Sequence, residues 1–546
     1  MQGLGDFARD WRYKEGDAFA QDDFKVTNRL TFNLGVRWEH IGDLGVANGK
    51  AGNVDLANVN PTPPVGGSLA GYIVGSNYNG PKAPLAGVEQ SKNTFGFNGQ
   101  NQNVWNPRLG FAWMMPGTDR FVLRGGAGMY HTTTQGQMNL QLCASAPFGE
   151  WNFGVGTGNY AASDANPMPN PGAFPQWIPY KGTVDSNGVA TGNVDTGYTL
   201  GSFALDWRPP TTYHFSLGLQ SRLPGGAVLD VTYAGARDLH LIVGTTVNTA
   251  PLASPSHPIR GQTKSTVANI NMRKPYLGWA PNSMYQWRMG NEAWYNALQT
   301  SLSQQWKHSL MYQASFTWAR LLSPVPDFTT GTNVVGPSGD QNNLRAGYGP
   351  DQNIRPLRFV LSMLYKLPSP SQSHLMTETL GGWSLATATL IQDGRQESIG
   401  YTATNNVYGN NVDRASFAAG CTAKNLSTTG SLQSRINGYV NTKCLSTPAV
   451  IGDDGIATDY GNTPNGVIRG VDQVNADISL AKTFQARWPR EGANATFRAD
   501  FFNAFNHPNF GDPDLAYTGP TASAFGTITG MSTNPRILQF SIKLGF

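Results

Sequence analysis

The chain alternates apolar and polar residues along much of its length. Its last segment, RILQFSIKLGF, alternates Leu538, Phe540, Ile542, Leu544 and Phe546 with polar residues or glycine. Successive side chains of a β-strand point to opposite faces of a sheet, so this period of two predicts a strand with one apolar face.

About 13 segments share this pattern, which predicts an antiparallel all-β protein. Many of them reach about 10 residues, which is long for a soluble sheet and right for a tilted strand that crosses a membrane. Their approximate spans are 8–25, 29–40, 106–114, 120–131, 211–222, 227–243, 294–306, 310–320, 356–367, 382–392, 473–484, 494–506 and 536–546.

Short and long connections alternate between these segments. Compact soluble domains contain few structureless loops beyond about 15 residues. Outer-membrane barrels, in contrast, have short periplasmic turns and long extracellular loops, and the asymmetry favours that architecture. The long connections, rich in glycine, asparagine, proline, serine and threonine, run roughly over 41–105, 132–210, 244–293, 321–355, 393–472 and 507–535.

The composition agrees with a membrane β-barrel. Of the 546 residues, 14% are charged, where about 25% is usual in soluble domains. No run of about 18 apolar residues occurs, so we expect no membrane-spanning helix. The net charge of +4 is too small to argue for a nucleic-acid partner. A large soluble β-sandwich or propeller would also alternate and is the alternative fold.

Aromatic residues lie where a barrel would need them. In lipid, β-structure spans only as a closed barrel, with aromatic residues at both interfaces. Trp38, Trp113, Trp306 and Trp383 lie at or near the ends of expected strands. Phe546 would occupy the periplasmic interface, and a terminal aromatic residue resembles the signal that the bacterial barrel-assembly machinery reads.

The three cysteines leave their pairing open. Cys421 and Cys444 lie in one polar stretch and either form a loop disulfide or remain two free thiols, whereas Cys143 stands alone. CxxC pairs and zinc-ligand spacing are absent from the sequence.

Several segments resemble TonB-dependent outer-membrane receptors of the Oar-like type, with a carboxypeptidase-regulatory-like domain, which are abundant in Acidobacteria. The resemblance runs over nearly the whole chain in family order. The segments include FAQDDFKVTNRLTFNLGVRWEH (19–40), NPRLGFAWMMPGTDRFVLRGGAGMYH (106–131), YNALQTSLSQQWKHSLMYQASFTWARLL (295–322), LGGWSLATATLIQDG (380–394) and FRADFFNAFNHPNFGDP (497–513).

The family implies a barrel of about 22 strands around an N-terminal plug. Because only about 13 strands are readable, residues 1–546 resemble the C-terminal part of such a barrel. We find neither plug nor signal peptide nor regulatory domain in the sequence, and expect these and the other strands upstream. The TonB complex would act only through that plug.

The sequence carries no acyl-transfer triad, P-loop or zinc signature, so we expect no enzyme, cofactor or metal site. Its eight histidines are scattered. Asp453 and Asp454 either bind calcium or form a solvated turn.

Two groups of residues are candidates for contact with solute or plug. Charged residues on the polar side of the strands would line the barrel interior or contact the plug: Arg37, Arg124, Arg498 and Asp500. Aromatic residues in the long loops would contact solute or pack on one another: Trp151, Trp177, Tyr180, Trp279 and Trp287.

The resemblance implies an outer-membrane receptor that imports a large, scarce solute, such as a carbohydrate, peptide or metal chelate. Its partners would be outer-membrane lipid, the barrel-assembly machinery and that solute. A surface or adhesion protein that uses the barrel as an anchor is the alternative function.

Overall fold

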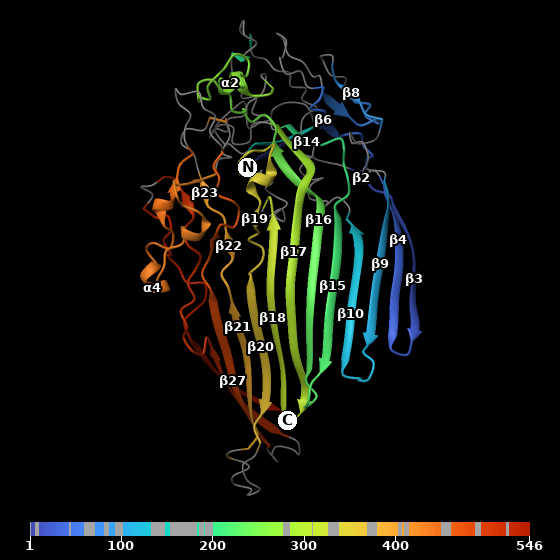
Figure 1. Ribbon diagram of the computed structural model, residues 1–546, viewed down its shortest axis with the longest axis vertical. Coiled ribbons are helices and arrows are strands. Elements are labelled where there is room, and N and C mark those ends of the chain that lie inside the picture. The colour runs from blue at the N-terminus through green and yellow to red at the C-terminus, as the bar shows by residue number, and fades with distance from the viewer. Residues whose placement is uncertain are drawn as a thin grey trace.

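The computed structural model describes residues 2–5, 10–42, 45–58, 71–80, 87–92, 102–132, 148–152, 183–184, 190–191, 200–276, 284–307, 309–325, 338–368, 379, 381–401, 407–408, 414–448, 460–485, 493–519 and 523–545. Long strands stand side by side in one sheet, and most short elements gather toward one end of it (Figure 1).

The main sheet follows chain order along a path of 13 strands, and each strand is antiparallel to the next. Two further strands pair onto its sides: β14 (Leu200–Phe203) with β17 and β19 (Gly349–Pro350) with β18. The path comprises β3 (Glu15–Thr27), β4 (Leu30–Ile41), β9 (Gln102–Met114), β10 (Phe121–His131), β15 (Thr211–Arg222), β16 (Val228–Thr246), β17 (Met284–Lys307), β18 (Leu310–Ser323), β20 (Leu357–Lys366), β21 (Trp383–Gln392), β27 (Gln473–Gln485), β28 (Asn494–Phe502) and β30 (Ile537–Gly545).

The remaining elements of the described residues are short. The strands are β1 (Gln2–Gly5), β2 (Trp11–Arg12), β5 (Gly45–Val46), β6 (Gly52–Val54), β7 (Tyr72–Val74), β8 (Glu89–Gln90), β11 (Gly149–Asn152), β12 (Thr183–Val184), β13 (Ala190–Thr191), β22 (Gln396–Glu397), β23 (Gly400–Tyr401), β24 (Ser416–Phe417), β25 (Leu445–Ser446), β26 (Ile468–Arg469) and β29 (Ala516–Tyr517). The helices are α2 (Ile270–Arg273) and α4 (Leu432–Arg435), with 3₁₀ turns η1 (Leu344–Gly347), η2 (Ala423–Asn425) and η3 (Thr442–Cys444). No helix of the described part of the chain is long and apolar enough to cross a membrane.

All the segments predicted from alternation contain strands of this path. The largest difference is β17, which begins at Met284 instead of near residue 294, so part of the expected loop 244–293 is strand. The pairing of β16 with β17 shifts register between Asp238 and Ile242, and His240 takes a φ of 57° there. This β-bulge hides the continuing strand from a search for strict alternation.

The apolar face of the sheet remains largely uncovered. Leu217 is 51% exposed, Trp318 60% and Phe540 63%. Pairing such as Tyr233 with Leu298, and Leu298 with Trp318, joins these side chains across neighbouring strands. A face of this kind needs an apolar surrounding, because leaving large apolar side chains in water is unfavourable.

The sheet is not closed among the described residues, because β3 and β30 each pair with one neighbour only. Since the path has an odd number of strands and all neighbours are antiparallel, β3 and β30 run in the same direction. Direct pairing between them would therefore be parallel, unlike every other pair of the path.

Candidate functional site on the polar face of the sheet

The face opposite the apolar side chains carries a cavity of about 500 Å³. Its polar lining comes from strands β17 to β28, and register pairs place Gln313 beside Ser362, and Ser479 beside Asp500. Residues opposite one another in an antiparallel pair share a face. The predicted residues Arg498 and Asp500 both line this cavity.

Arg498 and Asp500 form the best-defined charged pair of the cavity. Arg498 Nε donates to Asp500 Oδ1 over 2.8 Å and to Ser479 Oγ over 2.9 Å. The Asp500 side chain is only 12% exposed, whereas that of Arg498 is 55% exposed. The guanidinium therefore keeps donors available to a molecule in the cavity while its Nε satisfies the carboxylate.

Asp477 lines the same cavity, although it was not among the predicted site residues. It accepts from Asn475 Nδ2 over 3.0 Å and from the Asn503 backbone N–H over 2.9 Å. Both Asp477 and Ser479 fall on the polar side of the alternation in 473–484. The alternation alone could therefore have identified them as residues of the polar face.

A second cavity, of about 520 Å³, lies on the polar face of strands β3 to β16. The Arg108 guanidinium lies 4.5 Å from the centre of the Tyr130 ring, and Asn33 Nδ2 donates to Asp23 Oδ1 over 2.6 Å. Gly126 lines this cavity, and a Cβ there would lie 3.1 Å from the Leu109 carbonyl oxygen. Small residues leave the wall open between these polar side chains.

Arg37 is held by two carboxylates on the same face. Its guanidinium lies 3.1 Å from Asp17 Oδ2 and 2.6 Å from Glu39 Oε1. Asn106 then donates to Glu39 Oε2 over 2.7 Å. The Arg124 side chain is exposed on β10 and makes no hydrogen bond or ion pair with another described residue. The four charged residues predicted from sequence thus form separate groups along one face.

The structure describes the surroundings of only one of the predicted aromatic residues, Trp287. Trp287 was expected in a long loop, in contact with solute or packed on other loop residues; the loop placement is wrong, because Trp287 lies in β17, and its side chain is only 7% exposed. It packs with Phe203 and Trp207, at a ring distance of 5.3 Å to Phe203. Trp151 belongs to β11, where only its backbone is described. Trp177, Tyr180, Trp279 and Phe546, with Asp453 and Asp454, lie outside the described residues.

Parts of the two expected loops 393–472 and 507–535 fold together around a core of their own. We call residues 396–401, 414–448, 467–471, 510–519 and 523–528 the loop module. Its buried core consists of Ile399, Ala415, Leu426, Tyr439, Val440, Cys444, Leu445, Ile468, Val471, Tyr517, Phe525 and Ile528. These long loops therefore pack on one another, which is one of the two alternatives that the sequence left open for the long loops.

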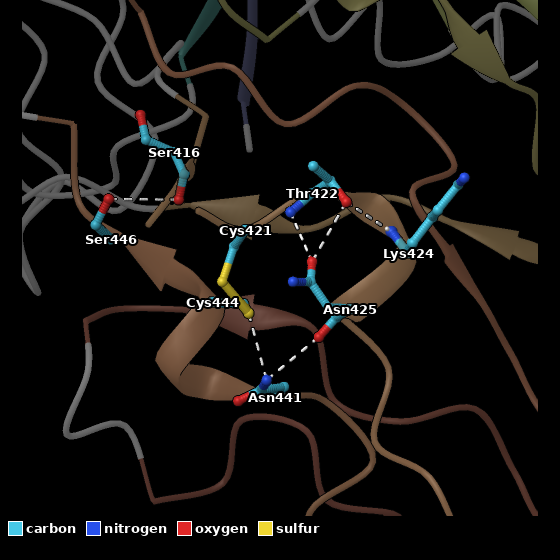
Figure 2. Close-up of a disulfide and its surroundings, with 8 residues drawn as sticks. All are labelled: Ser416, Cys421, Thr422, Lys424, Asn425, Asn441, Cys444 and Ser446. Carbon is cyan, nitrogen blue, oxygen red and sulfur yellow. Dashed lines mark hydrogen bonds between the residues drawn. A yellow bond between two sulfur atoms is a disulfide. The ribbon is translucent and has the colours of Figure 1, made fainter. Parts of the chain in front are cut away.

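A disulfide joins Cys421 to Cys444 within the loop module, which resolves the pairing that the sequence left open (Figure 2). Next to it, Thr422 and Asn425 form a capping box at η2. Asn441 Nδ2 lies 3.3 Å from Cys444 Sγ and donates to the Asn425 carbonyl over 3.2 Å. These contacts join the segment 421–425 to the segment 441–444.

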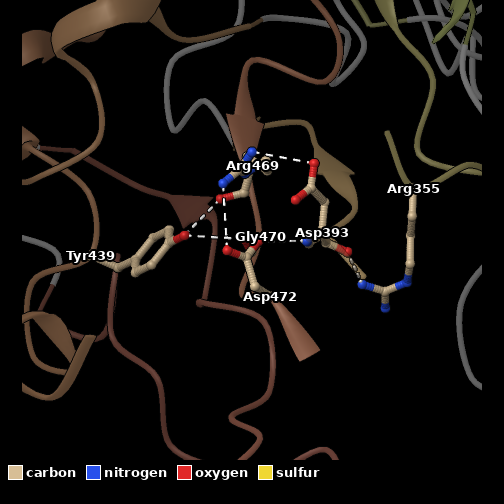
Figure 3. Close-up of polar contacts among 7 residues, drawn as sticks. Arg355, Asp393, Tyr439, Arg469, Gly470 and Asp472 are labelled. Atoms are coloured by element: carbon tan, nitrogen blue, oxygen red, sulfur yellow. Dashed lines mark hydrogen bonds and ion pairs between the residues drawn. The ribbon is translucent and has the colours of Figure 1, made fainter. Parts of the chain in front are cut away.

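Ion pairs connect the loop module to the ends of the long strands (Figure 3). Arg469 lies 3.3 Å from Asp393, directly after β21, and 3.5 Å from Asp472, directly before β27. Arg355 Nη1 donates to the Asp393 carbonyl over 2.6 Å. Tyr439 Oη donates toward the Arg469 and Gly470 carbonyls, at 2.8 and 3.1 Å.

Burial, more than the charge of Asp472, raises the pKa of Asp393, although Arg469 opposes the shift. Burial likewise raises the pKa of Glu397, with Asp512 adding to it and Arg395 opposing it. The described residues hold no group of three or more histidine, cysteine or acidic side chains that could bind a metal ion.

The family model described as "Outer membrane beta barrel domain" matches residues 1–539. No curated protein matches the sequence. Among solved structures, the outer membrane transporter YddB from Escherichia coli is similar at 9% identity and a TM-score of 0.44, covering 97% of this chain and 44% of that one. The siderophore receptor PirA from Acinetobacter baumannii is similar at 12% identity and a TM-score of 0.40, covering 99% and 46%. The chain spans less than half the length of these structures.

Proposed function

This chain belongs to the outer membrane beta barrel domain family, and on that premise we propose that it is part of a TonB-dependent receptor that imports a large, scarce solute. The protein lies in the outer membrane, and the exposed apolar face of its sheet suits contact with lipid. The opposite face is polar and faces the interior of the barrel.

The polar face with its two cavities carries the proposal. A path for a solute through the membrane needs polar walls, because a polar group that loses water without gaining a partner costs free energy. Arg498 and Asp500, Asp477, and the Arg37 group supply both donors and acceptors along this wall. A carbohydrate, a peptide or a metal chelate would each find partners there. The subtype that the sequence resembles, the Oar-like receptors, is part of this proposal.

In this proposal the energy comes from the inner membrane through TonB, which acts on a plug domain packed against the polar face. Arg37, Arg124, Arg498 and Asp500 would contact either the plug or the solute. Phe546 would serve the barrel-assembly machinery during insertion.

Uptake measurements test the proposal. The gene is deleted from its native strain, and cells receive three labelled probes at low concentration: a ferric siderophore, a maltodextrin and an oligopeptide. We expect uptake of at least one probe to fall, to return with the wild-type gene, and to fall equally in a strain without TonB. Unchanged uptake of all three, or uptake that continues without TonB, would exclude the proposal for these solute classes.

The disulfide-linked loop module favours a second candidate, a surface protein that binds a partner through this module. A deletion strain that loses adhesion to surfaces or to other cells, while it takes up all three probes normally, would support this second function against transport.

A further inference from the structure

At one place on the apolar face, arginines take the positions of apolar residues. Along β16, Tyr233 points to the apolar face, and so does Arg237, four residues further on. Along β18, Trp318 and Arg320 have the same relation, two residues apart. Trp294 of β17 is the register partner of Arg237, whereas Arg320 pairs with Asn296, two residues further along β17.

Both arginines lie at the height where the membrane ends. Arg237 is the tenth residue of β16 and Arg320 the eleventh of β18, and both strands start at short turns, which we assign to the periplasmic side. A tilted strand crosses the hydrocarbon in about 9–11 residues. The guanidinium groups therefore stand at the outer boundary, immediately above exposed apolar side chains, of which Tyr233 is 42% exposed and Leu298 36%.

The charge at this boundary is not neutralised. The Arg320 side chain is exposed and makes no hydrogen bond or ion pair with any residue that the structure describes. Arg237 lies 4.4 Å over the Trp294 ring and 3.5 Å from Glu292. Glu292 is shared with Arg345, whose side chain is 78% exposed, at 3.1 Å. Two guanidinium groups thus share the carboxylate of Glu292, and the Arg320 side chain has no carboxylate partner among the described residues.

We propose that strands β16 to β18 bind a phosphorylated lipid of the outer leaflet, with its acyl chains on Tyr233, Leu298 and Trp318 and its phosphates at Arg237 and Arg320. Guanidinium groups bind phosphate oxygens in pairs and lose less hydration than ammonium groups do. Two strand spacings of about 4.8 Å and a register offset of two residues, at about 3.3 Å each, place the Cα atoms of the two arginines about 12 Å apart across β17, which suits a head group with two phosphates.

The site is independent of the proposed transport, because its residues face lipid and not the interior. The test uses the full chain in nanodiscs of phosphatidylcholine with a few mole percent of diphosphorylated lipid A. Native mass spectrometry measures lipid A retained per protein, at equal protein and lipid content. For the variant Arg237→Gln with Arg320→Gln, we expect retention about tenfold lower than for the wild type.

A matched control is Arg358→Gln. Arg358 is exposed on β20 and pairs with Thr317, on the opposite face of the sheet, so its loss should leave retention unchanged. Lipid A without phosphates should be retained no better by the wild type than by the double variant. A variant with Arg237→Gln and Arg320→Lys should retain more diphosphorylated lipid A than the double glutamine variant does. Heat-modified migration on gels confirms that each variant is folded.

Three results would overturn the proposal. Equal retention by wild type and double variant would show that the arginines do not bind the head group. Loss of bound lipid A on adding millimolar inorganic phosphate, without dependence on acyl chains, would show an anion site only. A wild type that forms dimers through this face, with a monomeric double variant and no lipid A retained, would assign the surface to a second copy.

Discussion

Removal of the Cys421–Cys444 disulfide should release the loop module locally while the long strands remain folded. The bond closes a loop with a sequence separation of 23 residues. In the chain-entropy description, closing a loop of this length removes about 3 kcal/mol of conformational freedom from the open state. Cys444 is only 4% exposed and lies in the core of the module beside Leu445, so the open state also exposes that apolar contact.

The assay is amide hydrogen exchange of residues 414–448 in the purified protein. The variant Cys421→Ser with Cys444→Ser should exchange about a hundredfold faster there, since about 1.4 kcal/mol corresponds to a factor of ten. The strands β27 and β28 should exchange as in the wild type, because their ladder does not include the module. Cys143→Ser, which removes the third cysteine, is the control.

Unchanged exchange in 414–448 for the double variant would refute this reasoning. It would mean that the core of the module, not the covalent link, determines its opening. Faster exchange throughout β27 and β28 would also refute it, because the module would then be part of the cooperative unit of the sheet.

Three further predictions concern the same module, and hydrogen exchange measures each. Tyr439→Phe removes the donor to the Arg469 and Gly470 carbonyls, so the free energy of opening should fall by about 1 kcal/mol, and an unchanged value would contradict the geometry of that contact. Burial raises the pKa of Glu397, so its protonated form stabilises the module fully below the ordinary pKa of glutamate, and this stabilisation is lost as the pH rises through the raised pKa. The module should therefore open more readily at neutral than at mildly acidic pH. Glu397→Gln should make the free energy of opening less dependent on pH. Gly526→Ala should destabilise the module by more than about 1 kcal/mol, because Gly526 has a φ of 76° and the new Cβ would lie 3.1 Å from Val440 Cβ, whereas Gly438→Ala, with open space around it, should be nearly neutral.

Alternation predicted the long strands well because each strand lies between two different surroundings. In β15 the predicted and observed bounds, Thr211 to Arg222, are the same. One face must be apolar and the other polar over the whole length of such a strand, so the period survives in the sequence. Where a bulge interrupts the ladder, as at His240, the period breaks and the continuation of the strand is lost to prediction.

The loop module could not be predicted in this way. Its core joins Ile399, Tyr439 and Tyr517, which are far apart in the sequence and have no common period. The same holds for Trp287, whose burial depends on Phe203 from a distant segment. The site residues Arg498 and Asp500 were found because they belong to a strand, and their partner Ser479 follows from register, which the sequence alone does not supply.

The length of β17 has a consequence for what can reach this protein from outside the cell. Its 24 residues, at a rise of about 3.3 Å each, make a strand about 80 Å long. At a tilt of about 40° it stands about 60 Å high, of which the apolar band of the membrane takes about 25 Å. About 35 Å of its height therefore lies beyond the apolar band. Large molecules that approach from outside the cell would contact this projecting part of the sheet before they reach the bilayer.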